Sequence, residues 1–158
     1  MISPNQEYLR RGNKIAGFVI HMTEGSFKSG VEWCLNSESQ VSYHFIIDTD
    51  GSDVCLVMPE NTAWHAGKRI QSEKYTEILG NNPNFTTIGI ALTGYASEPP
   101  TASQIAKCAK LINMLAVYYG IKLDKNTIIT HHAIRHDKIC PGPHVSIDSL
   151  LYLSQLPQ

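Results

Sequence analysis

Two histidines and one cysteine, far apart in this 158-residue chain, form its most reactive combination of side chains: His21, His131 and Cys140. Two neutral imidazoles and one thiolate suit zinc, and three protein ligands leave the fourth tetrahedral position open, as in catalytic zinc sites. Such a site could polarise a carbonyl group and lower the pKa of water toward about 7, and amide hydrolysis needs both effects. Because buried and surface histidines are common, these residue types alone leave other interpretations open.

The positions of these residues favour a site. His21 ends an apolar run that predicts a strand over residues 15–20, and His131 follows a second predicted strand over residues 127–130. Strand ends are where α/β folds tend to place their sites. Cys140 lies in the segment HDKICPGPH, where two prolines and a glycine predict a rigid, irregular loop that could hold a ligand in place.

Strand and helix signals mix along the chain and predict an α/β fold. The clearest helix covers residues 101–119, because it starts with a capping box, ends at Gly120 and carries apolar residues at helical spacing. The other predicted elements are a strand at 88–92, short helices at 31–35 and 146–153, and a hairpin formed by 41–47 and 53–58. We therefore predict one α/β domain over residues 1–158, in which helices cover a central sheet of at least five strands.

Composition argues against several classes of protein. Thirteen Lys and Arg against fourteen Asp and Glu give a formal charge of -1, so no nucleic-acid partner is expected. No membrane insertion is expected either, because the apolar runs are far shorter than the about 20 residues of a membrane-spanning helix. The polar N-terminal segment lacks the apolar core of a signal peptide, which predicts synthesis in the cytoplasm without an export signal.

The four cysteines are widely spread and form no Cys-x-x-Cys pair, which argues against a zinc ribbon or a thioredoxin-like redox pair. Cys108 belongs to the apolar stripe of the predicted helix, and Cys34 and Cys55 are also expected in the core. Four cysteines could pair in three ways, but a chain of this length without an export signal favours free thiols.

Six short motifs run in order through nearly the whole chain, from about residue 15 to 145. They are VIHMTEG with His21, VSYHFIIDTDG with Tyr43, TAWHAGK with Trp64 and His65, TTIGIAL, IITHHAI with His131, and KICPG with Lys138 and Cys140. In this order they resemble the zinc-dependent N-acetylmuramoyl-L-alanine amidases, the family shared by phage endolysins and peptidoglycan-recognition proteins. An ordered set of six motifs is far more specific than any one of them.

The resemblance implies a central mixed β-sheet flanked by helices, one zinc ion, and hydrolysis of the amide between the lactyl group of N-acetylmuramic acid and L-alanine. It assigns His21, His131 and Cys140 as the metal ligands, Tyr43 to a place beside the zinc-bound water, and Lys138 to stabilisation of the oxyanion. The spacing of Lys138 and Cys140 agrees with these roles, because residues two apart in an extended loop can face the same small volume. A cation there would stabilise charge developing on the carbonyl oxygen.

One position departs from a pattern of many cytosolic relatives. They carry Glu as the last residue of an I-G-I-E motif, where it acts as a base, and this sequence has Ala91. Proton transfer is then left to Tyr43, Lys138 or hydroxide, as in the Tyr/Lys branch of the family. Cys140 favours an enzyme, because recognition members that bind peptidoglycan without cleaving it typically lack this ligand.

Two pairs of neighbouring residues require a choice. The first histidine of the matching motif is the ligand, so His131 is favoured over His132, and neighbours on an extended chain point opposite ways. By the same alternation, Tyr43 and His44 are expected on opposite faces of a strand, with Tyr43 at the site and His44 structural.

Three further residues are candidates for substrate binding, each with a plainer alternative. Trp64 and His65 could line a groove in which an aromatic ring stacks on a sugar or stem peptide, or they could pack at a corner of the fold. Thr23, two residues after the first ligand, could donate a hydrogen bond to a ligand or to substrate.

The sequence therefore predicts a zinc amidase acting on peptidoglycan or muropeptides, with a phage or prophage lysin as the leading role. Such a lysin would reach the cell wall after release by another route. A cytosolic amidase that recycles soluble muropeptide fragments is the second interpretation, and Ala91 weighs mildly against it. A non-catalytic recognition module is the third, and Cys140 argues against it.

Overall fold

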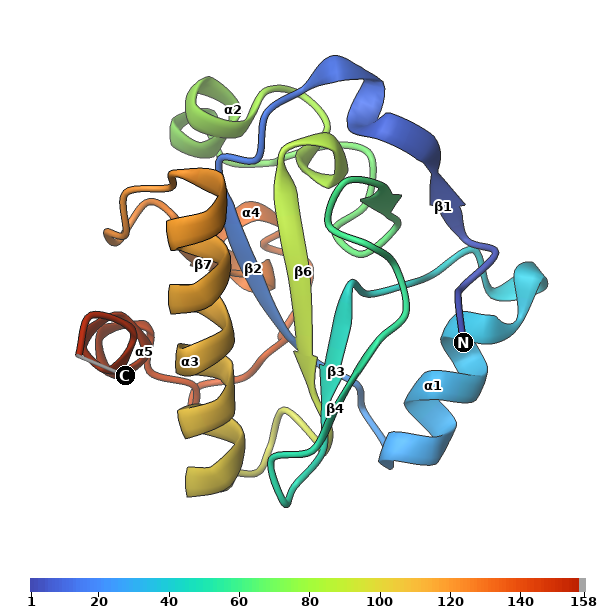
Figure 1. Ribbon diagram of the computed structural model, residues 1–158, viewed down its shortest axis with the longest axis vertical. Coiled ribbons are helices and arrows are strands. Elements are labelled where there is room, and N and C mark those ends of the chain that lie inside the picture. The colour runs from blue at the N-terminus through green and yellow to red at the C-terminus, as the bar shows by residue number, and fades with distance from the viewer. Residues whose placement is uncertain (157–158) are drawn as a thin grey trace.

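A five-stranded mixed sheet forms the centre of the molecule (Figure 1). The computed structural model describes residues 1–156. The strand order is β4-β3-β6-β2-β7, with β3, β6, β2 and β7 parallel and β4 antiparallel to β3. The strands are β2 (Gly17–Met22), β3 (Phe45–Ile47), β4 (Asp53–Cys55), β6 (Thr87–Leu92) and β7 (Ile128–Thr130). This topology confirms the predicted α/β domain with a central mixed sheet.

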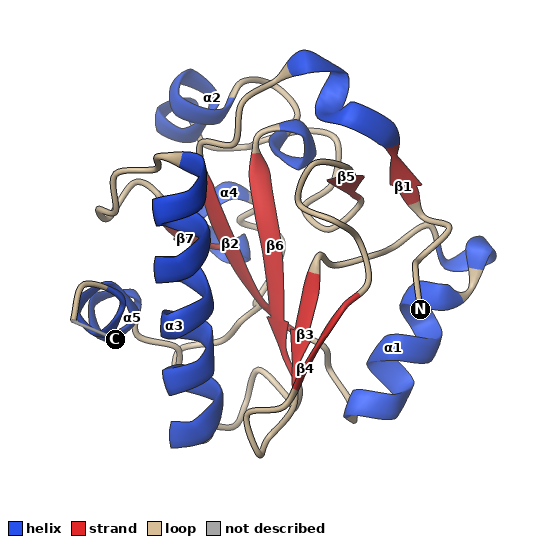
Figure 2. Ribbon diagram, viewed as in Figure 1, coloured by secondary structure: helices blue, strands red, loops and turns tan. Residues whose placement is uncertain are grey.

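Helices cover both faces of this sheet (Figure 2). The α-helices are α1 (Phe27–Leu35), α2 (Glu73–Leu79), α3 (Ala102–Tyr119), α4 (His131–Ile134) and α5 (Ile147–Ser154). One face packs against α3 and α5 in the largest apolar cluster, and the other face packs against α1, α2 and α4 in two smaller clusters. A small antiparallel sheet of β1 (Gln6–Glu7) and β5 (Thr62–Ala63) lies apart from the main sheet. Short 3-10 turns complete the structure: η1 (Tyr8–Gly12), η2 (Ser37–Ser39) and η3 (Pro83–Phe85).

The strand β6 shows how the two faces differ. Its apolar residues Ile88, Ile90 and Leu92 join the α3 side of the core. Successive side chains of a strand point to opposite faces, so Thr87, Gly89 and Ala91 face the other side. On that side β6 therefore presents only small side chains and one hydroxyl, which leaves room for larger groups from elsewhere in the chain.

The helix predicted at residues 101–119 is confirmed as α3 (Ala102–Tyr119) with Thr101 as its N-cap. The Thr101 side chain accepts from the Gln104 backbone N–H, and the Gln104 side chain accepts from the Thr101 N–H, so both halves of the capping box form. Gly120 ends the helix in the left-handed conformation at φ +68°.

The predicted hairpin forms, but both of its strands are shorter than expected. The second strand was predicted over residues 53–58, whereas β4 ends at Cys55. A strand was predicted over residues 41–47, whereas β3 begins only at Phe45, because the chain bends at His44. The backbone carbonyl of His44 accepts from the Leu56 N–H, and its N–H donates to Gly89, so this residue links the hairpin to β6. The prediction of a strand through residues 41–44 was therefore wrong.

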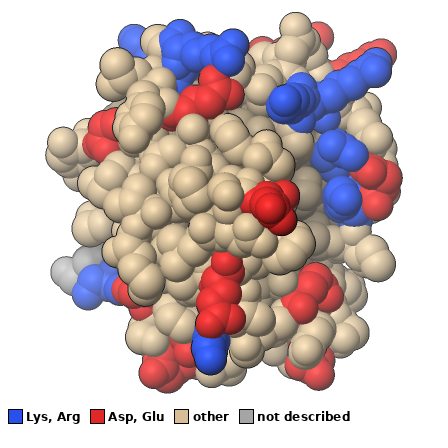
Figure 3. All heavy atoms as spheres, turned by 90° about the vertical axis from the view of Figure 1, so that its right-hand side faces the viewer, with Lys and Arg blue, Asp and Glu red and all other residues tan. Residues whose placement is uncertain are grey.

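The four cysteines are free, as expected from the sequence. Cys34 and Cys108 are fully buried, and Cys55 is half-buried against the core. Among the described residues, no helix combines the length and the apolar character needed to cross a membrane. Basic and acidic side chains are interspersed on the surface, with most Lys and Arg in the upper half of the face in Figure 3.

Candidate metal centre

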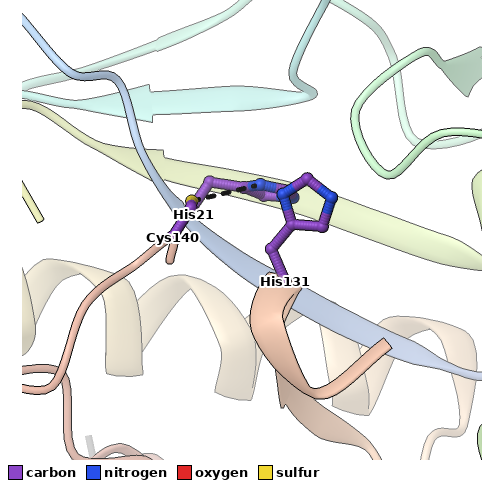
Figure 4. A group of neighbouring side chains, drawn as sticks. All are labelled: His21, His131 and Cys140. Carbon is purple, nitrogen blue, oxygen red and sulfur yellow. Dashed lines mark hydrogen bonds between the residues drawn. The ribbon is translucent and has the colours of Figure 1, made fainter. Parts of the chain in front are cut away.

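The three predicted ligands come together at one edge of the main sheet (Figure 4). His21 lies near the end of β2, and His131 begins α4 directly after β7. Because β2 and β7 are parallel neighbours, their carboxyl ends lie side by side. The loop after α4 brings Cys140 to the same place. The candidate ligand atoms of His21, His131 and Cys140 all lie within 4.8 Å of one another.

The donor set and its spacing fit zinc. Zinc–nitrogen bonds of about 2.0 to 2.1 Å and a zinc–sulfur bond of about 2.3 Å place tetrahedral donors about 3.3 to 3.6 Å apart. The Sγ atom of Cys140 lies 3.8 Å from Nδ1 of His21, close to that range. Two imidazoles and a thiol are a soft set that favours zinc over magnesium or calcium. His21, His131 and Cys140 could therefore hold one zinc ion.

The electrostatic surroundings keep both histidines neutral, as metal ligation requires. Burial holds the pKa of the fully buried His21 well below its ordinary value, and the neighbouring rings of His131 and His65 act in the same direction. Burial, followed by the positive charges of Lys138 and Arg135, lowers the pKa of His131 to about 4. Both imidazoles therefore retain a lone pair at neutral pH.

The thiol of Cys140 is less ready for ligation than the histidines. Burial raises its pKa to about 11, and the Met22 backbone N–H, which donates to Sγ at 3.2 Å, acts in the opposite direction. A thiol with this pKa is protonated at neutral pH, so binding of a cation must displace its proton.

The loop that carries Cys140 is tied to its surroundings at several points. His132 approaches it twice: its backbone N–H donates to the Cys140 carbonyl at 2.9 Å, and its Nδ1 lies 2.6 Å from the Lys138 carbonyl oxygen. Gly142 has φ +88°, and an added Cβ would lie 2.0 Å from the Ala96 carbonyl oxygen, so only glycine fits there. These contacts hold the loop against the end of the sheet.

His131 rather than His132 belongs to the ligand cluster. The predicted reason, an extended chain, is wrong, because both residues lie in the single helical turn α4. They still diverge, since neighbouring side chains on a helix project about 100° apart. His132 remains exposed and engages the loop backbone instead.

A cavity of about 450 Å³ opens at His131, the one of the three candidate ligands that lines it. Tyr43, Trp64, His131 and Lys138 are among the residues that line it, together with the basic residues Lys68 and Arg135. The ring centroids of Tyr43 and His21 are 5.1 Å apart. A wider hollow of about 790 Å³ beside α2 shares Arg135, but none of the three ligands lines it. The smaller cavity is therefore the candidate substrate site.

Tyr43 and His44 lie on the same side of the sheet, contrary to the expectation that they face opposite ways. Tyr43 contacts His21, and the ring centroid of His44 lies 5.6 Å from that of His65. Strand alternation does not apply to them, because both precede the start of β3. His44 is fully buried and accepts from the Gly89 N–H at 2.9 Å, which agrees with its predicted structural role.

The three predicted substrate-binding residues lie in different environments. Trp64 is half-buried on the cavity wall. Thr23 donates its hydroxyl hydrogen to the Gly25 carbonyl at 2.8 Å and is not among the cavity-lining residues. His65 borders the cavity but is only 5% exposed, and its two ring nitrogens lie near His21 and Thr87. Substrate contact by these three residues stays a prediction.

A row of buried polar residues lies behind His21, and of these only His65 was predicted as functional, for substrate binding rather than for contact with His21. It comprises His65, Thr87 and the guanidinium group of Arg10, which donates to the carbonyls of Asn84, Phe85 and Thr87. The one sequence signal is the period of two in TTIGIAL, where Thr87, Gly89 and Ala91 alternate with apolar residues. That pattern marks a face of the strand, but it does not indicate which residues pack there.

The sequence matches the N-acetylmuramoyl-L-alanine amidase family over residues 11–143. The chain belongs to this amidase family. The matched residues include all three candidate ligands, so the candidate metal centre lies within the region shared with a family of hydrolases that act on an amide bond.

Individual amidases show the same relationship. N-acetylmuramoyl-L-alanine amidase A of Achromobacter lyticus is 27% identical over 120 residues, which cover 74% of this chain and 60% of that protein. The crystal structure of AmpD aligns with a TM-score of 0.77 at 24% identity, covering 97% of this chain and 92% of AmpD. The amidase AmiD from E. coli aligns with a TM-score of 0.73 at 25% identity, covering 92% of this chain and 58% of AmiD. That AmiD structure holds the substrate anhydro-N-acetylmuramic acid-L-Ala-D-γ-Glu-L-Lys.

Proposed function

We propose that this protein is a zinc-dependent amidase that hydrolyses the bond between N-acetylmuramic acid and L-alanine in peptidoglycan. The observation that carries this proposal is the convergence of His21, His131 and Cys140 in a chain of the amidase family, with His131 also lining a cavity. When bound, zinc supplies a Lewis acid for the scissile carbonyl and a water of lowered pKa.

Two cavity residues support the chemistry. Burial, followed by the charge that Cys140 carries when ionised, raises the pKa of Tyr43, so its phenol stays protonated and can donate a hydrogen bond near His21. Lys138 lies on the cavity wall, where its ammonium group can stabilise negative charge that develops on the carbonyl oxygen. We propose these groups as the proton donor and the oxyanion-stabilising cation.

Ala91 supports the Tyr/Lys branch of the family. It pairs directly with His21 across β6 and β2, is fully buried, and packs in the apolar cluster that contains Ile46 and Leu56. An alanine there brings no carboxylate to the site, so proton transfer falls to other groups. This favours a lysin acting on intact cell walls, as expected from the sequence.

A second role has specific support from the comparisons. AmiD, which is similar over 92% of this chain, holds an anhydro-N-acetylmuramic acid peptide as its substrate. A chain with the same fold could take fragments of that kind, and in this role the protein would act on released muropeptides rather than on intact walls.

Two substrates distinguish the roles. The purified protein is incubated with cell-wall sacculi, followed by turbidity, and with an anhydromuropeptide, followed by chromatography of the released peptide. A lysin clears sacculi at a rate that exceeds or matches its rate on the soluble fragment, and a recycling amidase cleaves only the fragment. Chelator should abolish both reactions and zinc should restore them. Absence of peptide release from either substrate by the zinc-loaded protein would refute the proposed activity.

A further inference from the structure

We propose that His65 and Thr87 are positioning residues that fix which ring nitrogen of His21 is available to the metal, through a one-directional hydrogen-bond chain that ends on the Pro83 carbonyl. The hydrogen-bond chain runs from the metal centre into the core, and among His65, Thr87 and Pro83 only His65 borders the cavity. The inference rests on the proposed function only in that His21 is taken as a zinc ligand.

The direction of the chain is set at its inner end. The hydroxyl oxygen of Thr87 lies 2.6 Å from the carbonyl oxygen of Pro83. A carbonyl oxygen only accepts hydrogen bonds, so the single hydroxyl hydrogen of Thr87 points to Pro83. The Thr87 oxygen is then left as an acceptor toward its other neighbour, Nε2 of His65, at 3.3 Å.

The direction of the hydrogen bond to Thr87 also determines which ring nitrogen of His65 carries the hydrogen. To donate to Thr87, its Nε2 must carry the hydrogen. A neutral imidazole has only one N–H, and no carboxylate is a hydrogen-bond partner of this ring among the described residues, so its Nδ1 is an acceptor. That Nδ1 lies 3.0 Å from Nε2 of His21.

His21 must therefore donate from Nε2, which leaves Nδ1 without a hydrogen. Nδ1 is the atom that lies 3.8 Å from Sγ of Cys140, on the side of the candidate metal centre. The chain thus presents a free lone pair to the site and holds the ring in one tautomer. The Nε2 atom of His131, by contrast, is buried without a hydrogen-bond partner in the described part of the chain, so this anchoring applies to His21.

Packing holds the side chains of this hydrogen-bond chain in place. His21 is fully buried and His65 is 5% exposed, so water is largely excluded as a competing partner. The ring of His65 lies flat against Gly89 of β6, where an added Cβ would lie 2.4 Å from its Cγ atom. Arg10 donates to the Thr87 carbonyl at 3.0 Å and to the carbonyls of Asn84 and Phe85, which fixes the start of the strand. The acceptor that orients His21 is thus built into the core.

A pair of variants at Thr87 tests the chain without touching the cavity. Thr87→Val removes the hydroxyl at nearly constant shape, and Thr87→Ser keeps it. Metal-free proteins are titrated with zinc against a chromophoric chelator. We expect the valine variant to bind zinc about 10- to 100-fold more weakly, the size of effect typical of outer-shell partners, and the serine variant to bind within about threefold of the unchanged protein.

Thr62→Val is the matched control, because Thr62 is also a buried threonine, and its hydroxyl has no hydrogen-bond partner in the described residues. A general loss of packing or polarity in the core would affect both valine variants, whereas the proposed chain predicts weakened zinc binding only for Thr87→Val. Equal zinc affinities of the two valine variants, or a loss in Thr87→Ser as large as in Thr87→Val, would overturn the proposal.

The tautomers give a second readout that does not depend on metal or activity. Long-range ¹H–¹⁵N spectra of the metal-free protein distinguish a protonated from an unprotonated ring nitrogen. We expect both His21 and His65 to carry the hydrogen on Nε2, and His65→Asn, whose amide oxygen can replace Nδ1 as acceptor, to preserve this state of His21. A hydrogen on Nδ1 of either ring in the unchanged protein would refute the chain. Because neither readout needs peptidoglycan, failure of this inference is separate from failure of the proposed amidase activity.

Discussion

Replacement of Gly89 by alanine should destabilise the protein through one contact. The added Cβ would lie 2.4 Å from Cγ and 2.7 Å from Nδ1 of His65, against ordinary contacts of 3.4 Å or more. The ring must therefore move by about 1.0 Å (3.4 minus 2.4), but it is buried and hydrogen-bonded on both sides. Overpacking of this kind costs up to about 3 kcal/mol. The lower entropy of alanine in the unfolded chain offsets about 0.4 to 1 kcal/mol, which leaves about 2 kcal/mol.

Thermal unfolding of the metal-free protein measures this effect. In a chain of this size, 1 kcal/mol corresponds to about 2 to 4 °C, so Gly89→Ala should lower Tm by about 4 to 8 °C. The same substitution is then made in a His65→Ala background, where the ring is absent. There the methyl group meets a space instead of an imidazole, and Gly89→Ala should cost less than about 0.5 kcal/mol. An equal loss of Tm in both backgrounds would refute the reasoning, because the cost would then come from the backbone and not from His65.

Three further variants test the metal centre and its loop. Cys140→Ser should weaken zinc binding by more than about 100-fold, which exceeds the loss expected for a residue that only contacts a ligand. Competition with a chelator measures this affinity, and an unchanged value would exclude the thiol as a ligand. Lys138→Ala should keep one zinc ion per chain by elemental analysis while lowering kcat by about 10²- to 10³-fold, and loss of zinc instead would assign Lys138 to structure rather than to the reaction. His132→Ala should retain zinc and cost about 1 kcal/mol of stability, because the hydrogen bond to the Lys138 carbonyl is lost. His131→Ala should lose zinc, and equal zinc loss in the two variants would show that the ligand was chosen wrongly.

Local patterns were sufficient to predict much of the fold. The capping box at Thr101 and the left-handed glycine at its far end act within one turn of chain, so α3 was predicted almost to the residue. The apolar runs of β2 and β6 and the Asp50-Gly51 turn are equally local signals. The three metal-ligating candidates were also predicted from the sequence, because their residue types and ordered motifs resemble a known family.

The start of β3 could not be predicted in the same way. Residues 41–44 have strand-forming side chains, but the His44 backbone bonds to Leu56 and Gly89, and these long-range contacts bend the chain before the strand begins. The same bend places Tyr43 and His44 on one side of the sheet. Strand propensity was overridden by tertiary hydrogen bonds, as propensities commonly are.

By itself, the sequence determined the strands of the main sheet, the helices α1, α3 and α5, and the chemical types of the site residues, because periodicity, capping and turn chemistry act over a few neighbouring residues. It did not predict α2, α4 or the small sheet of β1 and β5. Only the tertiary structure decided that His65 lies behind His21 and against Gly89. That arrangement depends on the register of β2 against β6 and on the loop after β5, which places His65 against Gly89. His65 lies 44 positions from His21 and 22 from Thr87, and no local sequence pattern indicates contacts over such separations. These hydrogen bonds could therefore be identified only from the packed structure.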